Sequence, residues 1–139
     1  MKRSMWTCPK CGRIFNREGQ QHSCKKVPLE SHFTGKQRAK ELYDAVADRI
    51  GKEIGPVKTI SLPCCVHLFG TYDFVALLPK KDKLEIRFAL DRELKDSRIY
   101  TTVPLSKSSY KNCLYVWSKD EIDDELIEWL KESYNLKKM

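Results

Sequence analysis

The spacing of the first three cysteines constrains this chain more than any other feature of its sequence. Two residues separate Cys8 from Cys11, a proline follows the first thiol, Gly12 follows the second, and Cys24 comes later. This Cys-Pro-x-Cys-Gly pattern is typical of a zinc knuckle, because two thiolates at this spacing reach one ion and glycine permits the tight turn around the sulfurs. So short a segment cannot bury a hydrophobic core of its own. We therefore predict that the amino terminus folds around Zn²⁺.

Two histidines compete for the fourth position on this ion. His22 lies two residues before Cys24, so both side chains project from the same face of an extended segment. His32 is the alternative, in a finger whose third ligand is Cys24 and whose core position is Phe15. Ligand spacing favours His22, so the predicted set is Cys8, Cys11, His22 and Cys24, with His32 as the rival fourth ligand. Because four protein ligands leave no position for water, the predicted Zn²⁺ is structural.

The net charge of +7 is concentrated at the amino terminus. Residues 1–40 contain ten Lys and Arg against two Asp and Glu, a net charge of +8, and the other 99 residues carry 16 against 17, a net charge of −1. Such a cluster attracts polyanions. We therefore predict a non-enzymatic protein in which residues 1–33 form a basic zinc-binding module that binds nucleic acid or an acidic protein. The side chains expected to contact phosphate are Arg13, Arg17, Lys25 and Lys26.

The rest of the chain, residues 34–139, predicts an α+β domain with a helix at each end. Leu42, Val46 and Ile50 recur every four residues and indicate a buried stripe in a helix within 34–55. The segments Thr34–Gln37 and Ser118–Glu121 have the pattern of capping boxes, which start helices. Three acidic residues near the second box suit the positive end of a helix dipole better than an acid–base site, namely Asp120, Asp123 and Asp124.

Alternating apolar residues between the helices predict an antiparallel sheet of five to six short strands. The alternation is clearest over Leu84–Leu90, which the polar segment Lys80–Lys83 joins to Phe74–Leu78 as a hairpin. The connections are too short for parallel crossovers, so we expect both helices on one face of the sheet. The other expected strands cover residues 57–62, 66–69, 99–105 and 113–117.

A pocket on the open face of this sheet is the alternative basis for function, as a site for a small molecule. Glu85 and Arg87 lie on that face if their neighbours face the helices, and we expect them to form a cross-strand salt bridge in solvent. Tyrosines are candidates to line such a pocket, namely Tyr72, Tyr100, Tyr110 and Tyr115.

The later cysteines suggest a third and weaker hypothesis, a cysteine-dependent enzyme. Cys65 and His67 share a face of a strand, where the imidazole can activate a thiolate. Cys64 and Cys65 are also candidates for oxidation or for binding soft metals, although neighbours in a strand point to opposite faces. We expect Cys113 to pack in the core.

Membrane and secretory segments are not expected. The longest apolar runs are short, such as Phe74–Leu78, whereas a spanning helix needs about 18 or more apolar residues. The first residues are basic but do not lead into an apolar region of the kind found in signal peptides. We therefore expect a cytoplasmic protein.

Several of these residues together resemble a bacterial family known as domain of unknown function 5655. The motifs are W-x-C-P-x-C-G-R-x-F, Q-x-H-S-C and H-F-x-G-K, which begin at Trp6, Gln20 and His32. The resemblance extends to the terminal helix and implies a zinc motif joined to a compact α+β domain, with no assigned activity. It supports both candidate histidines as constrained positions. The family pattern has histidine where this chain has Cys113, which puts a shared use of that position in doubt.

Overall fold

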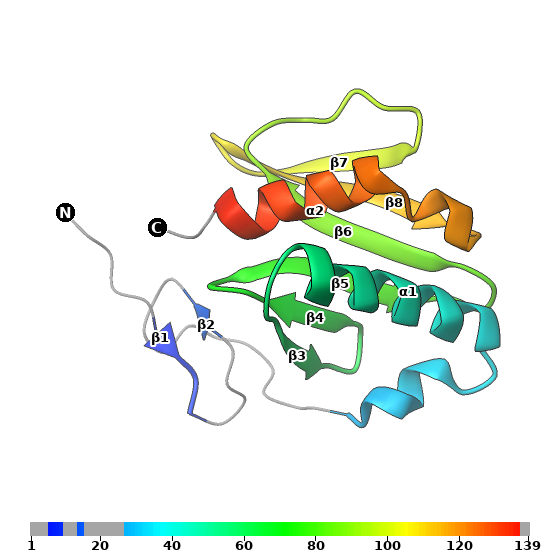
Figure 1. The fold of residues 1–139 in the computed structure, drawn as a ribbon. Coiled ribbons are helices and arrows are strands. Elements are labelled where there is room, and N and C mark those ends of the chain that lie inside the picture. The colour runs from blue at the N-terminus through cyan, green and yellow to red at the C-terminus, as the bar shows by residue number, and fades with distance from the viewer. Residues whose placement is uncertain (1–5, 10–13, 16–26, 137–139) are drawn as a thin grey trace.

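The protein is a two-layer α+β structure in which one antiparallel sheet carries two helices (Figure 1). The computed structural model describes residues 6–9, 14–15 and 27–136. The sheet has six strands in the order β3-β4-β5-β6-β8-β7, which confirms the predicted fold class. Its strands are β3 (Lys58–Ser61), β4 (Val66–Phe69), β5 (Asp73–Pro79), β6 (Leu84–Leu90), β7 (Ile99–Ser106) and β8 (Ser109–Val116).

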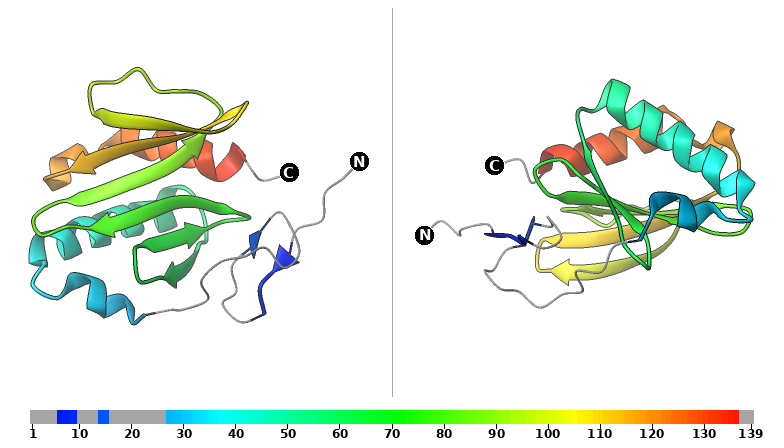
Figure 2. Two further views of the ribbon diagram at one scale, coloured as in Figure 1. Left: turned by 180° about the vertical axis from the view of Figure 1, so that it is seen from behind. Right: turned by 90° about the horizontal axis from the view of Figure 1, so that it is seen from below.

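Both long helices, α1 (Gln37–Glu53) and α2 (Asp124–Leu136), pack on one face of the sheet, as predicted (Figure 2). Alternate residues of β6 face these helices and form the centre of the core, namely Leu84, Ile86, Phe88 and Leu90. The intervening residues of β6 therefore face away from the helices. Within the described residues, neither helix has the length and apolar character needed to cross a membrane.

The predicted capping box at Thr34 is wrong. The short 3₁₀ helix η1 (Leu29–Phe33) comes first, and Gly35 has a φ of +70°, a conformation that glycine adopts without strain. This turn reverses the chain, so α1 begins at Gln37 after Lys36, with no side-chain cap.

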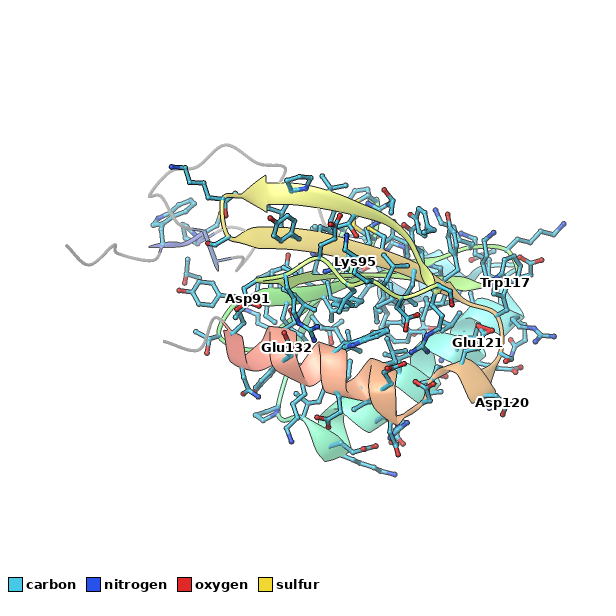
Figure 3. The ribbon with its side chains drawn as sticks, turned by 90° about the horizontal axis from the view of Figure 1, so that it is seen from above. Asp91, Lys95, Trp117, Asp120, Glu121 and Glu132 are labelled. Carbon is cyan, nitrogen blue, oxygen red and sulfur yellow. A yellow bond between two sulfur atoms is a disulfide. The ribbon has the colours of Figure 1, made fainter. Side chains whose placement is uncertain are left out.

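The second predicted capping box does not start the long helix either. Ser118 precedes the short 3₁₀ helix η2 (Lys119–Glu121), and the Glu121 carboxylate accepts a hydrogen bond from the backbone N–H of Trp117 at 2.7 Å. Figure 3 shows these two labelled residues at one end of the molecule. The long helix α2 starts after Asp123, whose carboxylate accepts the N–H of Leu126 at 3.0 Å. Asp123 therefore caps α2 and Asp124 lies in its first turn, as the sequence indicated.

A β-bulge between β4 and β5 determines which face of the sheet Asp73 occupies. Leu68 pairs with Val75, but Phe69 pairs with Asp73, so Phe74 is an extra residue in β5. Phe74 turns into the core, where its ring lies 5.1 Å from that of Tyr134 in α2. The bulge therefore shifts the alternation of β5 and places Asp73 on the open face.

The buried Asn112 ties the connection between β6 and β7 to the sheet. Its side-chain oxygen accepts hydrogen bonds from the backbone N–H of Leu94 at 3.0 Å and from the hydroxyl of Thr102 at 3.1 Å. Its amide nitrogen donates to the carbonyl of Arg92 at 3.2 Å. Figure 3 shows this connection, with Asp91 and Lys95 labelled, beside Glu132 of α2.

We expect Asn112→Leu to lower the free energy of unfolding by about 2–4 kcal/mol, because it leaves the buried N–H of Leu94 and the partly buried carbonyl of Arg92 without this partner. Urea denaturation measures this change. Thr102→Val, which removes only one of the three hydrogen bonds, is the matched control, with an expected loss of about 1 kcal/mol. Equal stability of the two variants would contradict this role for Asn112.

Candidate functional site

A pocket of about 220 Å³ opens on the face of the sheet opposite the helices. Side chains from five of the strands contribute to it. The lining includes His67, Asp73, Ala76, Arg87, Ala89 and Lys111, with Cys65 and Leu105 at its margins. Its lining combines apolar side chains with the polar side chains of His67, Asp73, Arg87 and Lys111.

The strand register explains why the pocket forms at this point. His67 pairs with Ala76, and Ala76 pairs with Arg87, so these residues form one row across β4, β5 and β6. Neighbouring strands are about 4.8 Å apart, which separates the outer two backbones by about 10 Å. The methyl group of Ala76 is the only side chain between them in this row, so a hollow remains. Ala89 repeats the pattern beside its partner Lys111.

One wall of the pocket holds a cysteine sulfur, an imidazole and a carboxylate in contact. The Sγ of Cys65 lies 3.1 Å from Nε2 of His67, and Nδ1 of His67 lies 2.6 Å from Oδ2 of Asp73. Cys65 is buried, and the other two side chains are partly exposed. The sequence predicted the pairing of Cys65 with His67 but not the part of Asp73.

A tight turn brings a second sulfur to this wall. Leu62 and Cys65 exchange two backbone hydrogen bonds of 2.9 and 3.3 Å, with Pro63 and Cys64 as the central residues. Proline suits the first central position of such a turn. Cys64 is therefore not in a strand, and its sulfur meets that of Cys65 at disulfide distance instead of pointing to the opposite face. Cys64, Cys65 and His67 form a group that could hold a metal ion.

The carboxylate of Glu85 is buried on the open face, where three polar side chains lie close to it. The Nε of Arg87 donates to it at 2.8 Å, the Tyr100 hydroxyl donates to it, and the Nζ of Lys80 lies 3.6 Å away. The expected cross-strand salt bridge in solvent is thus wrong on both counts, because the pair lies within β6 and Glu85 is 1% exposed. The stacked rings of Tyr100 and Tyr115, 4.5 Å apart, lie over this side of the sheet.

These neighbours shift the pKa values of the cluster. Burial alone would raise the pKa of Glu85, but hydrogen bonds from Arg87 and Tyr100 outweigh burial, so the pKa lies below its ordinary value. Burial and the hydrogen bond to Glu85 raise the pKa of Tyr100. Arg87 therefore retains its charge beside the pocket, with its Nε held by Glu85.

The tyrosines and Cys113 lie elsewhere than expected. None of the four candidate tyrosines lines the pocket, although Tyr100 and Tyr115 stack on the same face nearby. Cys113 is buried, as expected, but it pairs with Arg87 and so belongs to the open face rather than to the core beneath the helices. Burial raises the pKa of its thiol.

Most of the predicted zinc module lies outside the described residues. This applies to Cys11, His22 and Cys24 and to all four predicted phosphate contacts, Arg13, Arg17, Lys25 and Lys26. Of the candidate ligands, Cys8 and His32 are described, and both are buried. The ligand set, the nucleic-acid contacts and the boundary after residue 33 stay predictions.

The environment of His32 is unusual for a histidine. Its Nε2 is buried, and no hydrogen-bond partner for it exists among the described residues. The imidazole also has a hydrogen bond with the backbone of Leu62, which therefore involves the other ring nitrogen. Burial lowers the pKa of His32 despite this bond, so the ring is neutral near pH 7.

Residues 29–137 match the family described as Domain of unknown function (DUF5655). The chain belongs to this family, which confirms the family resemblance, although the motifs that begin at Trp6 and Gln20 lie outside the matched residues. No curated protein and no solved structure matches the chain. The match begins after the cysteine motif, so it does not bear on zinc binding.

We expect Glu85→Gln to remove part of the acid sensitivity of folding. Because the folded-state pKa of Glu85 is lowered, its ionisation stabilises the native state above the ordinary pKa of about 4.3, and this contribution is lost as pH falls through the folded-state value. Thermal denaturation between pH 7 and pH 3 should show the variant less stable at pH 7, by about 1–3 kcal/mol, and closer to wild type in acid.

Glu93→Gln is the matched control, because this exposed carboxylate pairs with Lys95 on the surface. Its expected effect is small at every pH. Parallel pH curves for wild type and Glu85→Gln would contradict the proposed ionisation.

Proposed function

We propose that this member of the DUF5655 family binds a small anionic molecule in the pocket on the open face of its sheet. The observation that carries the proposal is that Arg87 and His67 line the pocket on opposite sides of Ala76. In its hydrogen bonds with described residues, Arg87 uses only Nε, so its two terminal nitrogens are available to a ligand. A guanidinium offers paired donors that suit a carboxylate or a phosphate.

The charges around the pocket support an anion rather than a cation. Lys111 adds a second positive charge to the lining. The two nearby carboxylates are engaged, because Asp73 contacts the imidazole of His67 and Glu85 accepts from Arg87. The apolar part of the lining suits a ligand with a hydrocarbon body beside its acidic group, and it includes Ala76, Leu78, Ala89 and Leu105.

Titration with inorganic phosphate and with a panel of aliphatic and aromatic carboxylates, followed by backbone amide shifts in NMR spectra, tests this function. We expect shifts centred on residues 76, 87, 89 and 111. Arg87→Gln should weaken binding about 10- to 100-fold, because it removes a charged hydrogen bond. Ala76→Leu should abolish binding by filling the hollow.

Lys95→Gln is the matched control for the change in charge, because Lys95 is exposed and lies outside the pocket. It should leave the affinity unchanged. If no probe shifts these residues, or if Arg87→Gln and Lys95→Gln weaken binding equally, the pocket does not bind anions as proposed.

A structural zinc site at the amino terminus is a second proposal, and the surroundings of two described ligands support it. The strands β1 (Trp6–Thr7) and β2 (Ile14–Phe15) pair antiparallel, and Cys8 directly follows β1, as the first ligand does in a zinc knuckle. The buried Nε2 of His32, for which the described part of the chain offers no hydrogen-bond partner, supports His32 as the fourth ligand over His22. A ligating histidine commonly donates its other N–H to a backbone carbonyl, and His32 has such a partner in Leu62.

We expect His32→Ala to lower the zinc content of the purified protein by one equivalent and His22→Ala to leave it unchanged. Elemental analysis of both variants and of Cys8→Ser makes the comparison. The opposite result for the two histidines would restore His22 as the ligand, and an unchanged content in Cys8→Ser would reject the site.

A further inference from the structure

A second metal-binding group lies at the wall of the pocket, separate from the amino-terminal cysteines. The ligand atoms of Cys64, Cys65 and His67 all lie within 4.8 Å of one another. They meet because the turn at Pro63 folds Cys64 back beside Cys65, while Cys65 and His67 share one face of the same segment. Three residues within a span of four thus direct two sulfurs and one nitrogen to one point.

Asp73 orients the imidazole for metal binding. Its carboxylate lies 2.6 Å from Nδ1 of His67, so it accepts the N–H there and leaves Nε2 as the atom with a free lone pair. Nε2 is the nitrogen that faces the sulfur of Cys65. A carboxylate that holds the distal nitrogen of a ligating histidine is a recurrent feature of zinc sites, where it fixes the tautomer and strengthens the ligand.

In the reduced chain, the second sulfur favours a metal centre over a nucleophile. A thiol activated by an imidazole needs only Cys65 and His67, with Asp73 behind them. It gives no role to the sulfur of Cys64, which reaches the same point. Thiolates and imidazole are together the donors that Zn²⁺ prefers.

We propose that Cys64 and Cys65, when reduced rather than paired with each other as they are here, bind one Zn²⁺ ion together with His67, and that Asp73 is a positioning residue. Three protein ligands leave one coordination position open, which is typical of zinc that binds water or a substrate. Cys65, His67 and Arg87 all line the pocket, so we expect this position to be reached from the pocket. Direct contact of the ion with an anionic ligand rests on the proposed pocket function, whereas zinc binding does not.

Zinc content measured without any organic ligand tests the inference. The full chain is purified under reducing, oxygen-free conditions, equilibrated with Zn²⁺, desalted and analysed for zinc per chain. We expect Cys64→Ser with Cys65→Ser, and separately His67→Ala, to hold one equivalent less than wild type. Any zinc at the amino terminus is common to all these chains, so the difference reports this site alone.

Three further variants make the result specific. Cys113→Ser removes a buried thiol outside the group and should keep the wild-type zinc content. Cys64→Ser alone changes an exposed residue at the tip of a turn, where a folding defect is not expected, and should weaken zinc binding in competition with a chelator. Asp73→Asn should weaken it about 10- to 100-fold.

Two results would overturn the inference. One is an equal zinc content in reduced wild type and in the double cysteine variant. The other is a zinc-free group in which Cys65 reacts rapidly with iodoacetamide and His67→Ala slows that reaction, which would identify a nucleophile instead. Failure of the anion titration with zinc binding intact would reject the pocket function and leave the metal site standing.

Discussion

The small side chain of Ala76, between His67 and Arg87 in one row of paired residues, is the constraint on which the open-face site depends. Both helices cover the opposite face, so no element of the described domain core fills this hollow. A larger side chain at this position would occupy the space between the imidazole of His67 and the guanidinium of Arg87. The site thus follows from the strand register and from the small size of the Ala76 side chain.

Two local irregularities of the sheet bring the reactive groups to this hollow. The turn at Pro63 carries Cys64 back to Cys65, and the bulge at Phe74 moves Asp73 onto the same face as His67. The bulge is stabilised by packing on the helix side of the sheet, where the Phe74 ring contacts Tyr134 of α2. Bulges recur beside functional sites because they re-aim a side chain without altering the rest of the sheet.

The periodicity of the sequence predicted the sheet, the face covered by helices, and the shared face of Cys65 and His67. It did not predict Asp73, because the shift in register at Phe74 has no signal in the alternation of β5. It also missed the burial of Glu85, which depends on Tyr100 from a strand 15 residues away. The predicted start of α1 was wrong for a local reason, because Gly35 turns the chain at this point, and the predicted start of α2 was wrong because the short helix η2 follows Ser118.

A crystal structure of the reduced chain grown with Zn²⁺, with anomalous data collected at the zinc edge, tests the open-face site most directly. We expect an anomalous peak between the sulfurs of Cys64 and Cys65 and the Nε2 of His67, with the side towards Arg87 occupied by water or an anion. A site without a peak, with the two cysteines bonded to each other and Arg87 folded across Ala76, would contradict the existence of both the metal centre and the pocket.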